Sequence, residues 1–364
     1  MRGIMNACVI ATYRCNAHCH MCDIWRNPTK KSEEITPDVV AKMPGNLGRI
    51  NLTGGEPMLR DDIEELVRIL YKKCRIVEIS TNGFYTDRLV RIAEKYPKVM
   101  IRISLEGLPA LNDRLRGITN GFDHALRSIL ELKKTKVKDI GFSIVICDKN
   151  VKDLVSLYNL AVGLNVELAQ STMHNSWYFH KTDNKVDDKQ IVLCEMERFM
   201  TELLTSKRSS LRLKIKDWLR AFFNLRIYHY IKYGYSHQRT CTAGTDLFFL
   251  DPFGDILPCN GTDDKWVMGN LNEKTFKEIW TSPQAEKVRE MVKSCRRDCA
   301  FIGTARFDML RNPARPIKWI LKNKIRFMQG KSISVDLGEG DTIVDNIDTI
   351  PVLEREKSKK LVIK

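Results

Sequence analysis

Short runs of β-forming residues alternate with helical patterns along the first half of the chain. The β-rich runs are residues 6–12, 48–53, 75–81, 98–105, 139–146 and 165–171. Between them, apolar residues recur at the three- and four-residue spacing that marks one face of a helix. Such faces lie in residues 61–73, 86–96, 124–134 and 150–164, and Asn150 is placed to cap the last of them. Six alternating units predict a parallel sheet with right-handed crossovers, built either as a doubly wound sheet or as a partial barrel.

The pattern changes after residue 180. Residues 182–240 read as helices rich in aromatic and basic side chains. In residues 241–300, short apolar runs flank the turn DPFGD, which predicts a β-hairpin, and a helix is predicted at 282–293. We therefore expect a barrel over 1–180, a helical basic and aromatic linker over 181–240, a small cysteine-bearing domain over 241–310, and a basic helix with a charged tail over 311–364.

Composition narrows the class of protein. The 364 residues are 43% hydrophobic, which is enough to build a large core. They contain no run of roughly 18 or more apolar residues, so no transmembrane helix is predicted, and the apolar N-terminus lacks a small-residue cleavage site. We therefore expect a cytoplasmic protein in which the eleven cysteines serve metal binding or catalysis rather than disulfides.

The chain is strongly basic. Lysine and arginine number 60 against 45 aspartate and glutamate, which gives a formal net charge of +15. Such an excess attracts anions such as phosphorylated substrates, anionic lipid or nucleic acid, but a basic, solvated surface explains it equally well. The sequence has no nucleic-acid recognition motif, so no nucleic-acid partner is expected.

Three cysteines lie close together directly after the first predicted strand. Cys15, Cys19 and Cys22 have the spacing Cys-x3-Cys-x2-Cys. Ligands of α/β folds bind beyond the carboxyl ends of the strands, so this loop is expected at the active face. Three thiolates can ligate three corners of an iron–sulfur cluster and leave the fourth iron free for another ligand. The alternative is a structural zinc ion, with His18 or His20 as its fourth ligand.

Further motifs follow at the ends of later strands. They are LTGGEP at 52–57, ISLEG at 103–107 and NDRLRG at 112–117. Together with CNAHCHMC at 15–22, and in this order, they resemble the radical SAM superfamily over about residues 5–175. The resemblance implies a partial (β/α)6 TIM-like barrel and a [4Fe–4S] cluster held by Cys15, Cys19 and Cys22. It also implies S-adenosylmethionine (SAM) as the ligand of the fourth iron.

The resemblance assigns roles to residues of these motifs. The segment that holds the SAM amino group contains Gly54, Gly55, Glu56 and Pro57. Ser104 and Glu106 line the ribose side, with Glu106 standing where aspartate is usual. Arg116 grips the SAM carboxylate, since a guanidinium can bind a carboxylate through two hydrogen bonds. Ser143 is the nearest candidate for the family's ribose ligand on the fifth strand.

Four more cysteines lie in the second half of the chain. Cys241 and Cys259 flank the predicted hairpin, and the helix at 282–293 leads back to Cys295 and Cys299. The four side chains suit a structural zinc ion or an iron–sulfur cluster. The run from Cys241 through GN and IW resembles the SPASM and twitch extensions of radical SAM enzymes. The resemblance implies a twitch- or SPASM-like domain with one auxiliary [4Fe–4S] cluster that relays an electron.

The last predicted helix, in residues 315–331, is basic and amphipathic. One face carries Ile317, Leu321, Ile325 and Met328, and the neighbouring stripe carries Lys318, Lys322 and Arg326. Such a helix suits peripheral contact with a membrane surface. It also suits docking onto the barrel with its bases in solvent, and the sequence slightly favours that alternative.

The resemblance implies an enzyme that cleaves SAM reductively to a 5′-deoxyadenosyl radical, which abstracts hydrogen from a substrate. The expected partners are an electron donor such as flavodoxin or ferredoxin and a small molecule: a sugar, an aminocyclitol, or a nucleotide- or lipid-linked form of either. A peptide-modifying enzyme is the alternative, although the short segment before Cys15 leaves no room for a peptide-recognition domain. A non-catalytic iron–sulfur electron carrier is a third hypothesis. The expected substrate contacts, after the sixth strand, are His174, Asn175, Trp177, Tyr178 and His180.

Overall fold

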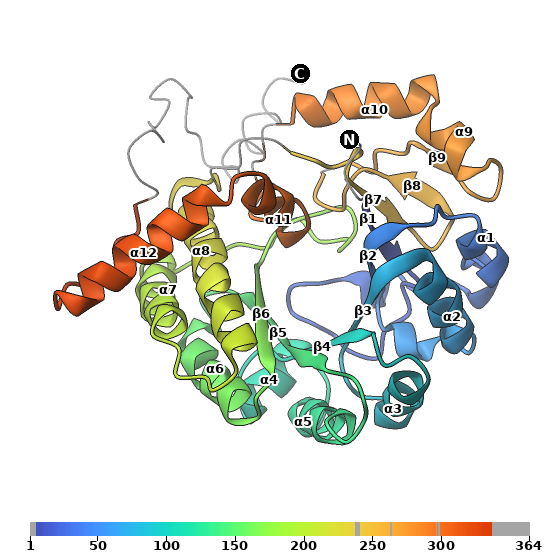
Figure 1. Cartoon of the computed structure of the whole chain (residues 1–364). Helices are drawn as coiled ribbons and strands as arrows, with labels where there is room; N and C mark the ends of the chain where they lie inside the picture. Colours follow the sequence, from blue (N-terminus) through green and yellow to red (C-terminus); the bar gives the residue numbers. More distant parts are fainter. Residues whose placement is uncertain (1–4, 237–240, 263, 296, 298, 337–364) are drawn as a thin grey trace.

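A curved, mostly parallel sheet with helices on its outer side forms the centre of the molecule (Figure 1). The structure is a computed structural model, and it describes residues 5–236, 241–262, 264–295, 297 and 299–336. Strands β1 to β6 are Asn6–Ile10, Leu47–Thr53, Cys74–Thr81, Met100–Ser104, Asp139–Ile146 and Glu167–Thr172. Each strand pairs in parallel with the next, without the reversal of order that a doubly wound sheet has. The partial (β/α)6 barrel is therefore confirmed.

The connections between these strands form the outer layer. Its helices are α1 (Pro37–Ala41), α2 (Ile63–Lys73), α3 (Thr86–Lys95), α4 (Pro109–Arg116), α5 (Gly121–Leu132) and α6 (Leu154–Gly163). Short 3₁₀ turns lie at Ile24–Arg26, Lys31–Glu33, Pro57–Leu59 and Val151–Asp153. Asn150 stands at the predicted N-cap position, but its side chain makes no capping hydrogen bond. It accepts instead from the amide of Cys147 at 3.0 Å and donates to the carbonyl of Val145 at 2.9 Å.

The segment after β6 packs on the barrel. Helices α7 (Lys189–Leu204) and α8 (Leu211–Tyr233) contact each other, and α8 also contacts β6. Three aromatic side chains of α8 are buried, namely Phe222, Phe223 and Tyr228. Helix α12 (Ala314–Met328) crosses the outside of α7 and α8 (Figure 1). In the described part of the chain, no helix combines the length and the apolar character needed to cross a membrane.

Strands β7 (Leu247–Leu250), β8 (Asp255–Leu257) and β9 (Gly269–Asn270) extend the barrel sheet on its β1 side. Strand β7 pairs in parallel with β1, and β8 returns antiparallel to β7, so the predicted hairpin is confirmed. Helices α9 (Phe276–Trp280), α10 (Pro283–Lys293) and α11 (Ile302–Arg311) follow. The cysteine-bearing C-terminal region thus shares one sheet with the barrel. The boundaries of the four expected domains stay predictions.

A buried ion-pair network connects α8 to the strands. Arg102 of β4 lies 2.6 Å from Asp139 and 3.0 Å from Glu167, which begin β5 and β6. Lys216 and Arg220 of α8 also pair with Glu167. Because an unpaired charge is costly in the interior, each member of this network depends on the others.

Replacing Glu167 with glutamine is expected to lower the free energy of unfolding by about 3 kcal/mol at neutral pH, because it leaves buried cations without their anion. Burial raises the pKa of Glu167, but the charges of Arg220, Arg102 and Lys216 outweigh burial and hold this pKa well below its usual value. A carboxylate of this kind stabilises the fold above its unfolded pKa and loses that effect as the pH falls. The difference in the free energy of unfolding between the wild type and Glu167→Gln should therefore shrink below about pH 4. Urea unfolding across this range measures this difference, with Glu94→Gln, at an exposed position of α3, as the control. A difference that does not change with pH contradicts the prediction.

Candidate active site

The cysteine loop, residues 15–22, lies beyond the carboxyl end of β1. Hydrogen bonds hold it against the ends of neighbouring elements. The amide of His18 donates to the carbonyl of Arg116 at the end of α4, at 2.8 Å. The side chain of Asn82, just after β3, donates to Asn16 Oδ1 at 2.7 Å. The loop is therefore fixed by segments that are far from it in the sequence.

Glycines allow these close contacts. Gly54 and Gly55 lie against the backbone that leads into the loop, where a Cβ on Gly54 would be 2.5 Å from the Thr12 carbonyl oxygen. Gly117 follows α4 with a φ of 55°, and a Cβ there would lie 2.8 Å from the His18 carbonyl oxygen. Any other residue at these positions would displace the cysteine loop.

The thiol groups of Cys15, Cys19 and Cys22 are partly buried and lie within electrostatic range of one another. Burial raises the pKa of Cys15 and of Cys22 to about 12, and it raises the pKa of Cys19 as well. The positive charge of Arg116 opposes this rise in all three. The free thiols therefore hold their protons at neutral pH, and binding of a metal cluster would release them.

Glu56 is a fully buried carboxylate just after β2. One oxygen accepts from the Thr81 hydroxyl at 2.8 Å and from the Met58 amide at 3.0 Å. The other accepts from the Asn82 amide at 2.7 Å. Burial raises the pKa of Glu56, and these hydrogen bonds oppose the rise. A nearby ammonium group would further favour the charged form. Pro57 is buried at the start of the following 3₁₀ turn.

Arg116 and Glu106 form a buried ion pair, with Nη1 3.5 Å from Oε1. Burial raises the pKa of Glu106 to about 7, and Arg116 opposes this rise. The guanidinium also lies within electrostatic range of Cys15 and Cys19. Its Nε is buried and has no hydrogen-bond partner among the residues that the structure describes. A buried donor without a partner is costly, and a carboxylate ligand at this place would satisfy it.

Asn150 belongs to this site although no motif points to it. It is fully buried, and its Nδ2 lies 3.5 Å from Glu106 Oε2, which also accepts from the Val145 amide at 2.8 Å. Ser104 and Ser143 lie opposite each other in the pairing of β4 and β5, so both are at this end of the site. Asn150 lies in a turn seven residues beyond Ser143 in the sequence, and only the folding of that turn brings its side chain back to Glu106.

The four remaining candidate ligands lie within electrostatic range of one another beside the hairpin. Cys241 precedes β7, Cys259 follows β8, and Cys295 and Cys299 lie between α10 and α11. Burial raises the pKa of Cys259 and of Cys299 to about 12, and charge on the other cysteines of the group adds to the rise. All eleven cysteines lie in described segments, and none of them forms a disulfide there. Within those segments, no group of three or more His, Cys, Asp or Glu side chains is arranged to hold a metal ion.

A loop after β6, residues 174–184, contacts both cysteine-bearing regions. The amide of Trp177 donates to the carbonyl of Thr262, close to Cys259, at 3.4 Å. Tyr178 is buried, and its hydroxyl donates to the carbonyl of Gly54 at 2.9 Å. Tyr178 therefore connects the loop of residues 174–184 to the end of β2. The same loop contains the other expected substrate contacts, His174, Asn175 and His180.

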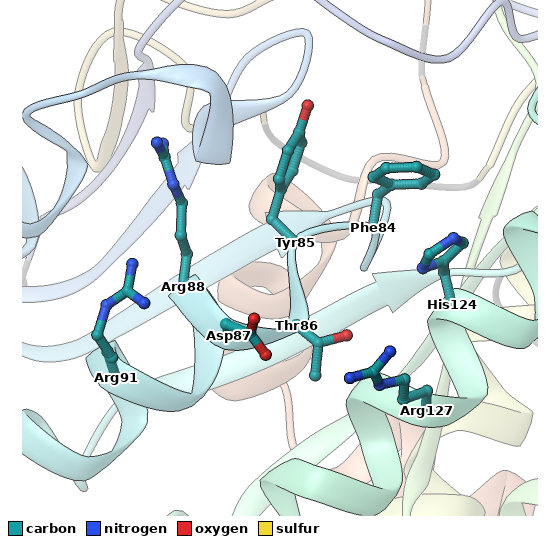
Figure 2. A pocket seen from close by; sticks show the side chains of 8 residues that line it. All are labelled: Phe84, Tyr85, Thr86, Asp87, Arg88, Arg91, His124 and Arg127. Atoms are coloured by element: carbon teal, nitrogen blue, oxygen red, sulfur yellow. The ribbon is translucent and has the colours of Figure 1, made fainter.

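An open, basic pocket of about 330 Å³ lies where α3 and α5 begin (Figure 2). Its lining consists of Phe84, Tyr85, Thr86, Asp87, Arg88, Arg91, His124 and Arg127. Burial raises the pKa of Tyr85, and the charges of Glu56 and Cys15 add to the rise, so this side chain lies near the cysteine loop. Three arginines against one aspartate make the pocket positive, which favours an anionic partner.

Two family models match the chain. The model of the radical SAM superfamily matches residues 9–161, which run from the end of β1 through β5 and include the cysteine loop. The SPASM model, which describes an iron–sulfur cluster-binding domain, matches residues 241–300 and includes the four cysteines beside the hairpin.

Curated relatives match over about three quarters of the chain. The pre-heme d1 synthase of Dinoroseobacter shibae is 23% identical over 300 residues, which are 75% of this chain and 72% of that protein. The mycofactocin maturase MftC of Mycolicibacterium smegmatis is 28% identical over 288 residues, 77% of this chain and 70% of that protein. The AdoMet-dependent heme synthase of Methanosarcina barkeri is 24% identical over 299 residues, 77% of this chain and 83% of that protein.

Solved structures share the fold. Native anSMEcpe with bound AdoMet gives a TM-score of 0.59 at 19% identity and covers 81% of this chain and 88% of its own. Streptococcus suis SuiB bound to S-adenosylmethionine gives a TM-score of 0.58 at 17% identity, covering 79% of this chain and 68% of its own. Since family models match both the barrel and the cysteine-bearing C-terminal region, the chain belongs to the radical SAM superfamily and carries a SPASM iron–sulfur cluster-binding domain.

Proposed function

We propose that this radical SAM enzyme abstracts hydrogen from a small molecule, such as a sugar, an aminocyclitol, or a nucleotide- or lipid-linked form of either. Its two domains imply a [4Fe–4S] cluster with SAM and auxiliary iron–sulfur binding. We assign the first cluster to Cys15, Cys19 and Cys22. We assign one auxiliary cluster, which relays an electron, to Cys241, Cys259, Cys295 and Cys299.

The residues around the cysteine loop suit the polar groups of SAM. Arg116 offers a buried donor to its carboxylate, and Glu56 offers a buried carboxylate to its ammonium group. Glu106 and Asn150 offer hydrogen-bonding groups to the ribose, beside Ser104. When bound, the cluster and SAM supply one-electron reduction and a hydrogen-abstracting radical. The chain supplies binding, orientation and exclusion of water, so the hydrogen abstraction needs no general base.

The observation that carries the small-molecule proposal is the loop of residues 174–184. Besides its contacts with Gly54 and Thr262, its Asn175 carbonyl accepts from Arg297, which lies between the last two cysteines, at 3.2 Å. The loop thus connects the barrel to the cysteine-bearing C-terminal region beside the strand ends. We infer that this connection leaves an entrance that suits a compact substrate better than an extended peptide. The names of two relatives, both of them haem-type synthases, are in keeping with a small-molecule substrate.

A peptide substrate is the second candidate. The relative MftC, at 28% identity, is named a mycofactocin maturase and favours it. The two candidates differ in where the abstracted hydrogen comes from, so isotope transfer separates them.

Anaerobic enzyme loaded with both clusters is incubated with SAM, dithionite and panels of deuterated sugars, aminocyclitols, nucleotide-linked sugars and peptides. The expected result is deuterium in the 5′-deoxyadenosine formed with a small molecule. Deuterium transfer from peptides alone would instead establish the second candidate. Mass spectrometry of the 5′-deoxyadenosine is the readout.

We infer that the reductant, an acidic carrier such as flavodoxin or ferredoxin, approaches the basic pocket of Figure 2. The pocket adjoins the cysteine loop through Tyr85, and complementary charge speeds encounter. Replacing Arg91 and Arg127 with glutamate is expected to slow 5′-deoxyadenosine formation with flavodoxin about tenfold at low salt. With dithionite the rate should not change.

The matched control for the reductant pocket is Lys72→Glu with Arg75→Glu. Both residues are exposed at the opposite end of β3, and they carry the same change in charge. Equal slowing by this control, or equal slowing with dithionite, contradicts the inference.

A further inference from the structure

Helix α12 packs on the protein through one face. Trp319, Ile320 and Asn323 are buried on that face. The Trp319 ring lies 5.8 Å from that of Phe222 in α8, and its Nε1 donates to the Ser334 carbonyl at 3.0 Å. This face holds the helix in place and includes none of the four residues of the predicted apolar stripe.

The opposite face is apolar and exposed. Its residues Ile317, Leu321, Ile325 and Met328 are 52, 54, 50 and 79% exposed. Their three- and four-residue spacing places them in one stripe along the helix. A continuous exposed stripe of large apolar side chains marks an interaction surface rather than part of a core.

Basic side chains flank the apolar stripe. Lys318 and Lys322 are exposed one turn apart, beside Leu321. Residues 311–331 contain seven lysines and arginines and no acidic residue. An apolar stripe with lysine and arginine at its border is the pattern of helices that lie in the interface of an anionic bilayer.

We propose that α12 is a peripheral membrane anchor, whose apolar stripe enters an anionic bilayer while Lys318 and Lys322 contact lipid phosphates. The packed face stays on α8, so binding needs no unfolding. Figure 1 shows α12 on the outer side of the layer formed by α7 and α8. A second copy fits this face less well, because a two-fold contact would bring like charges together.

The test is cosedimentation of the full chain with vesicles, which requires neither SAM nor turnover and is independent of the proposed function. The protein is expected to pellet with vesicles of phosphatidylcholine and phosphatidylglycerol and to stay in solution with phosphatidylcholine alone. Replacing Ile317, Leu321 and Ile325 with glutamine should lower the partition coefficient at least about tenfold. Replacing Lys318 and Lys322 with glutamine should lower it by about tenfold.

Matched controls keep these results interpretable. Leu108→Gln with Leu130→Gln removes apolar side chains of 40 and 44% exposure, one just before α4 and one in α5, and should leave binding unchanged. Lys136→Gln with Lys138→Gln removes two exposed lysines outside α12 and should likewise leave binding unchanged. Circular dichroism shows whether each variant keeps its helices, so that weak binding is scored only in folded protein.

Three outcomes overturn the membrane proposal. One is a wild-type chain that stays in solution with both kinds of vesicle. Another is equal loss of binding in the control variants. The third is a dimer in light scattering that the apolar-stripe variant converts to monomer, without any vesicle binding.

Discussion

Replacing Cys15, Cys19 and Cys22 together with alanine is expected to reduce 5′-deoxyadenosine formation to the background rate. Thiolates are the usual ligands of iron–sulfur clusters, and alanine offers no replacement. The loop is fixed by bonds such as that from Asn82 to Asn16, so it cannot move to recruit other ligands without losing them. The measurement is the anaerobic yield of 5′-deoxyadenosine from SAM and dithionite.

Iron content separates the two cysteine groups. The triple variant should keep the iron of the auxiliary group, about half of the total if both clusters hold four irons. Cys259→Ala should do the reverse, retaining reductive SAM cleavage while losing auxiliary iron. Cys74→Ala and Cys194→Ala, outside both groups, are the controls and should retain both. Formation of 5′-deoxyadenosine by the triple variant above background would show that the assignment is wrong.

Replacing Arg116 with alanine is expected to weaken SAM binding by about ten- to hundredfold, the effect of losing hydrogen bonds to a charged group. It should also lower the free energy of unfolding by about 3–5 kcal/mol, because it leaves Glu106 buried without its cation. Arg116→Lys keeps the charge but cannot bind a carboxylate through the same two hydrogen bonds. It should therefore recover more of the stability than of the affinity for SAM.

The measurements for Arg116 are calorimetric SAM binding to cluster-loaded protein and urea unfolding. The matched control is Arg114→Ala, since Arg114 lies on the same helix but is exposed. It should change both quantities little. Equal SAM affinity in Arg116→Ala and Arg114→Ala would contradict the carboxylate role, even if only the former is less stable.

The cysteine groups could be found from the sequence because the relevant spacing is local. Cys15, Cys19 and Cys22 lie in one loop, and the loop position follows from the strand before it. The order of the βα units was predictable for the same reason, since helical and strand periodicity are read within ten to fifteen residues. Asn150 stands at the N-cap position that the sequence predicts, but its side chain makes no capping hydrogen bond and contacts Glu106 instead, because its residue type suits both roles.

Contacts between distant segments had to come from the tertiary structure. The loop at 174–184 follows β6, yet it contacts Gly54 just after β2 and Thr262 beyond β8. The C-terminal hairpin, which lies in the small domain expected at 241–310, pairs with β1 of the barrel. All available strands compete to pair with the edge of a sheet. A local sequence pattern cannot show which of them pairs there.

The sequence by itself determined the alternating βα units, the two cysteine groups and the amphipathic character of the helix at 315–331, because each depends on residue types at short spacing. It left open whether the apolar stripe of that helix is core or surface. The tertiary structure decided this, since α12 packs through Trp319 and Asn323 and leaves Leu321 exposed. A helix with apolar residues on two faces buries the one that complements its neighbour, and that neighbour, α8, is distant in the sequence.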